Sequence, residues 1–152
     1  MTLCFRNRQR DCPVDLRLLR RVLRFALDKL LSVSGYELCF HLVPAKEMAR
    51  VNEEFLDHIG PTDVITFDHG GGKNLNGEIF VCPAVAIEQA REYRTSWQEE
   101  IVRYCVHGLL HLRGYDDVRT ADRRKMKLEE DRLVGALTDQ FAVARLSRAP
   151  VK

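Results

Sequence analysis

The sequence has 152 residues, of which 45% are hydrophobic and 30% are charged, and its net charge is +2. This composition excludes an intrinsically disordered chain, and no apolar run approaches the ~18–20 residues that cross a bilayer, which excludes a membrane-spanning helix. We therefore expect one globular domain over residues 1–141, followed by a basic tail over residues 142–152 that is expected to be disordered.

The cysteines and the charge distribution indicate where the protein works and what it binds. Five cysteines form no C-x-x-C pair, and no apolar leader stands at the N-terminus, so we predict reduced thiols, a cytoplasmic location and no membrane partner. Residues 1–29 carry eight Arg or Lys against three Asp, a charge of +5, which leaves −3 for the remainder. Such a basic end predicts an acidic partner, nucleic acid first, although a solvated helix face explains it equally well.

A short strand and an amphipathic helix are predicted for the first part of the chain. The strand covers residues 3–8, and Pro13 and Asp15 suit the first turn of the helix that follows. Leucine and alanine residues from position 16 to position 30 recur at helical spacing and define a buried face. Four arginines share this spacing on another face and are candidates for contact with an RNA backbone: Arg17, Arg20, Arg21 and Arg24.

Three strands and a short helix are predicted for the middle of the chain. Apolar and β-branched residues predict strands at residues 36–43, 64–67 and 77–82. The glycine-rich stretch between the last two strands is expected to be a hairpin connection, because it lacks the G-x-x-x-x-G-K-[ST] order of a phosphate-binding loop. The short helix covers residues 44–55, and we expect it to turn Met48, Val51 and Phe55 inward.

Three helices are predicted for the last part of the chain. Pro83 opens the first, which ends at Tyr93, and Ser96 caps the second, which runs from Trp97 to Arg113. The third covers residues 120–137, and its charged pairs at i,i+4 spacing are expected to form a solvated face. Apolar residues bury one side of the second helix, while the other side faces a cleft and carries Glu100, Tyr104, His107 and His111.

The strongest functional signal is the stretch HGLLHLRGYDD. The four-residue spacing of His107 and His111 places two imidazoles on one face of a helix, where they can hold one metal ion. Gly114 suits the left-handed residue that ends a helix, so the chain can turn back and carry two aspartates toward the ion. Position favours Asp117 as the third ligand and Asp116 as the residue that forms the turn, but these neighbours can exchange roles.

A third ligand six residues after the second histidine, with a glycine halfway, is also the layout of the metzincin proteases. Gly108 stands where those enzymes need a glutamate, which disfavours a peptidase. Three protein ligands leave the fourth position of a zinc ion open, which is the catalytic arrangement. The oxygen ligand makes manganese or iron acceptable alternatives to zinc.

The order PTDVITF, GEIFVC and HGLLHLRGYDD resembles the YbeY family of bacterial metal-dependent endoribonucleases, over residues 36–137. The resemblance implies an α+β fold, in which a small mixed sheet of about four strands packs with about five helices and a metal site lies at the end of a helix. It also implies zinc ligation by His107 and His111. Asp117 stands where the family has a third histidine, and Leu56 stands where it usually has an arginine thought to help engage RNA.

The resemblance implies a single-strand-specific endoribonuclease in ribosomal RNA maturation and ribosome quality control, with ribosomal RNA and the small ribosomal subunit as partners. The alternative is a ribosome-assembly or RNA-binding factor with a structural metal and little or no nuclease activity, which the two departures keep open. No general base is evident, and the candidates are Glu78, Asp63 and Asp116. Further cations that can contact phosphates are Arg50, Lys73, Arg103 and Arg113.

Overall fold

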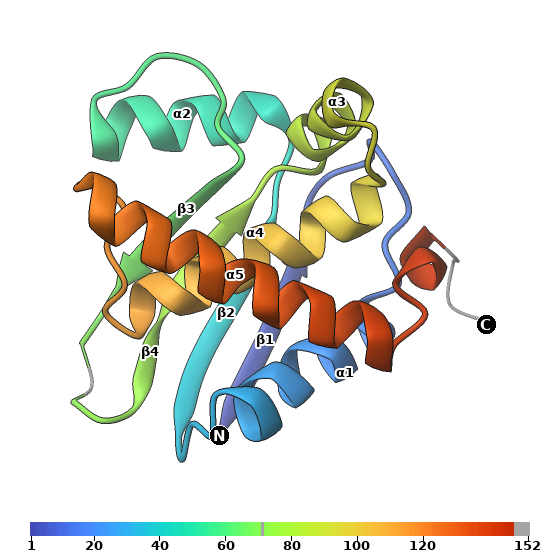
Figure 1. Ribbon diagram of the computed structural model, residues 1–152. Coiled ribbons are helices and arrows are strands. Elements are labelled where there is room, and N and C mark those ends of the chain that lie inside the picture. Colours follow the sequence, from blue (N-terminus) through green and yellow to red (C-terminus); the bar gives the residue numbers. More distant parts are fainter. Residues whose placement is uncertain (71, 148–152) are drawn as a thin grey trace.

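A computed structural model describes residues 1–70 and 72–147, and in it a four-stranded mixed sheet lies behind a layer of helices (Figure 1). The strands lie in the order β1-β2-β4-β3, with β1, β2 and β4 parallel to one another. The edge strand β3 runs antiparallel to β4, so the expected hairpin is confirmed. The strands are Thr2–Asn7 (β1), Tyr36–Leu42 (β2), Val64–Asp68 (β3) and Leu75–Val81 (β4).

Five α-helices in the described residues complete the expected α+β fold. They are Leu16–Phe25 (α1), Ala45–Leu56 (α2), Pro83–Tyr93 (α3), Trp97–Leu112 (α4) and Thr120–Gln140 (α5). A π-helical turn, η1 (Ala26–Leu30), extends α1, and a 3-10 helix, η2 (Val143–Ser147), follows α5. Within these ranges, no helix has both the length and the apolar character of a membrane span.

The helix α4 is seated directly on the sheet because two glycines allow close approach. A Cβ atom at Gly77 of β4 would lie 2.9 Å from Leu112 Cδ2, and one at Gly108 of α4 would lie 2.8 Å from Ile79 Cδ1. Because side chains alternate along a strand, the odd-numbered residues of β4 face α4 and the even-numbered ones face away. The away-facing side is covered by α2 at one end, through a cluster of Val43, Met48, Val51, Ile65 and Cys82.

The first helix begins later than its proline suggests. Asp15 is the N-cap residue, and its side chain accepts hydrogen bonds from the backbone N–H groups of Arg17 and Leu18. Pro13 therefore precedes the helix and does not occupy its first turn, which corrects the expected start. An aspartate carboxylate satisfies two otherwise unpaired N–H groups, which proline at this place cannot do.

The prediction that Phe55 turns inward is wrong. Its side chain is 62% exposed and meets only the edge of the Phe67 ring among the aromatic side chains described, at 5.5 Å between centroids. Asn52 takes the buried position in that turn, where its side-chain amide donates a hydrogen bond to the Gly60 carbonyl at 2.8 Å. The apolar face of α2 is therefore shorter than its periodicity predicts.

The expected disorder from residue 142 is also wrong for the first part of the tail. Residues Val143 to Ser147 form η2, in which Val143 and Leu146 are buried in the main core. The Leu146 carbonyl accepts a hydrogen bond from the Asp15 backbone N–H at 2.8 Å, so η2 fixes the start of α1. Residues 148–152 lie outside the described part of the chain.

Candidate metal centre and adjoining cleft

The end of α4 forms the turn that brings the third candidate ligand back to the histidines. Gly114 has φ +98°, and its N–H donates to the His111 carbonyl at 3.0 Å. The Tyr115 N–H donates to the Leu110 carbonyl at 3.0 Å, which completes a Schellman motif. Tyr115 packs against the main core, so the turn is held on both sides. The predicted helix end at Gly114 is confirmed.

The histidines and one aspartate converge to form a metal-binding geometry. Asp117 Oδ2 lies 3.7 Å from His107 Nε2 and 3.4 Å from His111 Nε2, and the ligand atoms all lie within 4.8 Å of one another. An ion bound tetrahedrally at ordinary zinc bond lengths keeps its ligand atoms roughly 3.4 Å apart. The three residues can therefore hold one metal ion.

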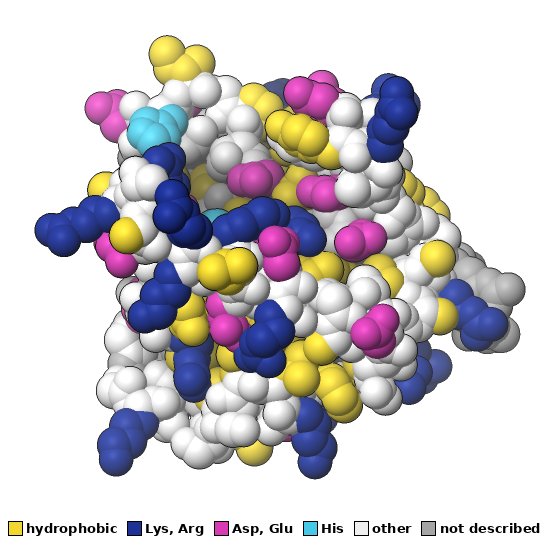
Figure 2. Space-filling model, in the orientation of Figure 1, with side chains coloured by type: hydrophobic (Ala, Val, Ile, Leu, Met, Phe, Trp, Pro, Cys, Tyr) yellow, Lys and Arg dark blue, Asp and Glu magenta, His cyan; other side chains and the backbone are white. Residues whose placement is uncertain are grey.

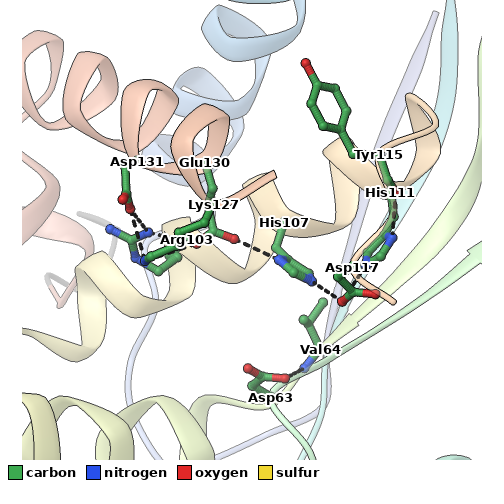
Figure 3. A network of polar contacts seen from close by, with 10 residues as sticks. All are labelled: Asp63, Val64, Arg103, His107, His111, Tyr115, Asp117, Lys127, Glu130 and Asp131. Carbon is green, nitrogen blue, oxygen red and sulfur yellow. Dashed lines mark hydrogen bonds and ion pairs between the residues drawn. The ribbon is translucent and has the colours of Figure 1, made fainter. Parts of the chain in front are cut away.

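Outer hydrogen bonds orient both imidazoles toward the same point (Figure 3). His107 Nδ1 donates to Glu130 Oε1 at 2.7 Å, and His111 Nδ1 donates to the Tyr115 carbonyl at 3.1 Å. Both acceptors lack a proton to give, so each ring carries its proton on Nδ1 and directs the Nε2 lone pair toward Asp117. Two imidazole nitrogens and one carboxylate oxygen are a donor set that fits a divalent metal.

Glu130 of α5 is the charged group that ties this centre to the neighbouring helix. It is 6% exposed, and its second oxygen accepts a hydrogen bond from Arg103 Nη1 at 2.8 Å. Burial opposes the ionised form, but the hydrogen bonds from His107 and Arg103 outweigh it and lower the pKa of Glu130. Burial likewise opposes protonation of His107, yet the bond to Glu130 prevails and raises the pKa of His107.

A cleft of about 630 Å³ opens beside His107 and Asp117, lined by residues of α3, α4, α5 and the start of β3. Its lining carries charges of both signs, and Arg103 lies 2.8 Å from Glu130. Asp63, Glu100 and Glu130 lie among the lining residues, and so do the cations Arg103, Arg123 and Lys127. Figure 2 shows the hollow, with acidic side chains inside it and Lys and Arg side chains along one margin.

Of the three candidate bases, Asp63 is the one that the structure places in this cleft. Glu78 points to the opposite face of the sheet, where it binds His41 at 2.8 Å and His69 at 2.9 Å, so its assignment as a base is corrected. Asp116 Oδ1 accepts a hydrogen bond from the Val118 backbone N–H at 3.0 Å. That bond is the turn-forming role, and it leaves Asp117 as the aspartate beside the histidines.

Most of the cations proposed for RNA contact do not line the cleft. Arg20 donates a hydrogen bond to the Leu3 carbonyl and lies over the Phe5 ring, and Arg21 lies over the Phe141 ring. These two arginines of α1 therefore also have contacts within the fold, and RNA contact by the four arginines stays a prediction. The other candidates outside the cleft are exposed and stay predictions: Arg17, Arg24, Arg50, Lys73 and Arg113.

Arg103 is the cation from that set that lines the cleft, and α5 supplies two more that the sequence reasoning missed. Arg103 and Lys127 both bind Asp131, at 2.7 and 3.1 Å, so one expected i,i+4 pair of α5 forms on an exposed face, and Arg103 of α4 joins it. Glu130 was missed as well, although one signal marks it. It is an acidic residue within the buried stripe of α5, which consists of Met126, Glu130, Leu133, Val134 and Leu137.

The structure shows where the two residues that depart from the expected motifs, Gly108 and Leu56, lie. Gly108 faces β4, so a side chain there would meet Ile79 and not the metal centre, which agrees with the absence of a peptidase glutamate. Leu56 is 43% exposed at the end of α2 and does not line the cleft.

Comparison with known proteins gives a consistent result. The family model described as Endoribonuclease YbeY matches residues 5–138. A relative named Endoribonuclease YbeY from Finegoldia magna is 35% identical over 137 residues, covering 86% of this chain and 90% of the relative. One of the same name from Chlorobium luteolum is 45% identical over 82 residues, which span 54% of this chain and 60% of that protein. A solution structure of a Thermotoga maritima protein has the same fold, with a TM-score of 0.70, 24% identity and 99% coverage of both chains.

Proposed function

This chain belongs to the YbeY family of endoribonucleases, and from that premise we propose that it cleaves single-stranded RNA at the centre formed by His107, His111 and Asp117. We propose zinc as the ion, with manganese or iron as acceptable substitutes because one ligand is an oxygen. Ribosomal RNA is the proposed substrate, the small ribosomal subunit the proposed partner and the cytoplasm the proposed location.

The observation that carries this function is a three-ligand centre at the edge of an open cleft. Structural zinc sites are closed by four protein ligands, whereas catalytic sites have three. His107, His111 and Asp117 keep 26%, 29% and 45% of their side chains exposed, so the centre is accessible to a substrate. A bound divalent ion supplies electrostatic stabilisation of the negative charge that grows on phosphoryl oxygens during cleavage.

Other residues of the chain orient the ligands, attract the RNA and accept a proton. Glu130 and the Tyr115 carbonyl hold the imidazoles in one tautomer, and Arg103 keeps Glu130 ionised. Arg123 and Lys127 line the cleft and are exposed, so they can attract the RNA backbone. Asp63 is the proton acceptor that we propose, because it lines the cleft and its charge acts on His107.

Asp63→Asn tests that assignment, since the amide keeps the shape of the side chain and loses the base. We expect kcat to fall by about 10²–10⁴-fold, while metal content measured by elemental analysis stays unchanged. A normal kcat in this variant would remove Asp63 from the mechanism.

Cleavage of a labelled, unstructured RNA by the metal-loaded protein tests the function itself. We expect cleavage of the unpaired strand, little cleavage of the same strand in a duplex, and loss of activity with chelator or in His111→Ala. His58→Ala is the matched control, because His58 is exposed and does not line the cleft. A ribosomal RNA fragment compared with an unrelated RNA of equal length tests the substrate.

The same samples separate an enzyme from an assembly factor with a structural metal. In an enzyme, His111→Ala loses metal and activity but keeps its far-UV circular dichroism. If the metal-loaded wild type binds RNA without cutting it and His111→Ala unfolds, the ion is part of the folding energy and the proposed activity is wrong.

A further inference from the structure

The face of α4 that carries the histidines also carries two polar residues that the metal centre does not use. Tyr104 lies three residues before His107 and Glu100 lies seven before it, and both line the cleft. At 1.5 Å of rise per residue, Glu100 stands about 10 Å along the helix axis from His107. That span is comparable with the reach of one nucleotide from its phosphate to the far edge of its base.

Both side chains are buried, and each can form more hydrogen bonds than it forms in the structure. Tyr104 is 4% exposed, and its hydroxyl has no partner at hydrogen-bond geometry in residues 1–70 and 72–147, although burial and the neighbouring Glu100 carboxylate raise its pKa. Glu100 is 8% exposed, and its carboxylate accepts one hydrogen bond, from Thr95 Oγ1 at 3.0 Å, with no ion pair to any described cation. Buried polar groups without partners cost stability, so a ligand that supplies the partners explains why they are kept.

We propose that this end of the cleft is a subsite for an unpaired guanine base of the RNA, an inference that rests on the endoribonuclease function proposed above. The Glu100 carboxylate accepts hydrogen bonds from guanine N1–H and N2–H, and the Tyr104 hydroxyl donates to O6. Tyr93 ends α3 on the margin of the cleft with 63% of its surface exposed, which offers a ring for stacking.

The charges of the cleft favour this orientation and this base. The buried Glu100 and the half-buried Asp63 repel a phosphate, while the exposed Arg123 and Lys127 attract one, so the base enters beside Glu100 and the backbone stays with the two exposed cations. Guanine presents two adjacent N–H donors to a carboxylate. Uracil presents one N–H between two carbonyl oxygens, and a carboxylate repels these oxygens. A base held here cannot pair with a complementary strand, which accounts for the preference for single strands.

Titration of the full-length protein with the four ribonucleoside 5′-monophosphates tests the subsite without cleavage. The phosphate is common to all four, so differences in Kd report the base. We expect guanosine monophosphate to bind roughly ten- to hundredfold more tightly than uridine monophosphate, as for a bidentate base contact. Glu100→Gln should abolish the difference, and Glu92→Gln, the same change at an exposed site on α3, should preserve it.

Tyr104→Phe separates binding from a structural role. Removing a buried hydroxyl without a partner should leave Tm unchanged or raise it. The subsite requires that the affinity for guanosine monophosphate falls in the same variant, by roughly fivefold or more, because O6 loses its donor. An unchanged affinity would assign the hydroxyl to the fold alone and overturn its role in the subsite.

Equal Kd values for the four nucleotides, or a guanine preference that survives in Glu100→Gln, would overturn the inference. The outcome is independent of whether RNA is cut. RNA cleavage with no base preference contradicts the subsite alone, whereas guanine-selective binding without cleavage of any RNA contradicts the proposed function alone.

Discussion

At the scale of single residues, Glu130 decides how firmly the metal centre is held. Its carboxylate accepts hydrogen bonds from His107 on one oxygen and Arg103 on the other, and it is almost fully buried. Carboxylates that orient a metal-binding histidine also raise the basicity of the ring and thereby its affinity for the ion. Glu130 therefore acts on the ion through His107.

Glu130→Gln keeps the size of the side chain and removes its charge. We expect metal affinity to fall by about 10–100-fold, measured by competition with a chromogenic chelator. Glu129→Gln is the matched control, because the neighbouring Glu129 contacts Arg132 and not the histidines. Equal loss of affinity in both variants would point to the total charge of α5 in place of the bond to His107.

The two neighbouring aspartates provide a second test at this scale. Asp117→Ala should remove most of the bound metal, since Asp117 Oδ2 is the oxygen beside both Nε2 atoms. Asp116→Ala should keep the metal and lower stability by about 1 kcal/mol, the ordinary value of one lost hydrogen bond. Elemental analysis and urea unfolding measure the two effects, and the reverse pattern would mean that Asp116 is the ligand.

At the scale of secondary-structure elements, the contact between α4 and β4 sets the position of the histidines. Gly108 of α4 touches the Ile79 side chain of β4, where an added Cβ would lie 2.8 Å from two of its carbon atoms. Ile79 is fully buried, so it has little room to move away. A side chain at position 108 must push the helix off the sheet.

We expect Gly108→Ala to destabilise the protein by about 1–3 kcal/mol through overpacking, partly offset by about 1 kcal/mol of helix propensity. Gly135→Ala in α5 is the matched control, because nothing lies within 4 Å of an added Cβ there. That variant should gain about 0.5–1 kcal/mol. Urea unfolding curves give both values, and a stabilised Gly108→Ala would show that α4 shifts freely on the sheet.

Periodicity in the sequence was sufficient for most elements, because apolar residues at regular spacing report burial directly. Local residue types predicted the β3–β4 hairpin, the Ser96 cap of α4 and the turn at Gly114, all of which depend on near neighbours in the chain. Both kinds of signal have the same limit. They failed where a distant partner decides the outcome. Glu130 meets His107 across 23 residues, and Arg20 binds a strand 17 residues away. The position of Phe55 was predicted wrongly because Asn52 takes the buried place in that turn. Asn52 is polar, and its hydrogen bond to the Gly60 carbonyl cannot be read from the spacing of apolar residues.

At the scale of the whole molecule, the face of the sheet away from α4 holds a second group of charged residues. His41 is 6% exposed, its Nε2 binds Glu78, and its Nδ1 lies 3.1 Å from the Arg8 guanidinium. Burial lowers the pKa of His41, with a smaller contribution from Arg8, although the bond to Glu78 opposes the change. Glu47 of α2 also faces this group, through its ion pair with Arg8.

A lowered histidine pKa makes global stability depend on pH in a defined direction. The unfolded chain takes up the proton first on acidification, so the contribution of His41 is complete above about pH 6.5 and is lost as the pH falls through the lowered pKa. The contribution of His41 to the free energy of unfolding therefore decreases from pH 7 toward pH 5, whereas His107, whose pKa is raised, contributes in the opposite direction. Urea unfolding at several pH values should show a flatter decrease in His41→Asn than in the wild type or in the exposed-site control His58→Asn. An equal slope in all three would exclude His41 as the source.

The three candidate metal ligands lie within eleven consecutive residues, on the last turns of α4 and the bend that follows. Closing so short a segment around an ion costs little chain entropy compared with closing a long loop. The order of assembly follows from this. The ion can be captured by a helix end and its turn before the parallel strands, which are far apart in sequence, have found one another. The bond from His107 to Glu130 forms only when α5 packs on α4, so full orientation of the ligands requires tertiary packing.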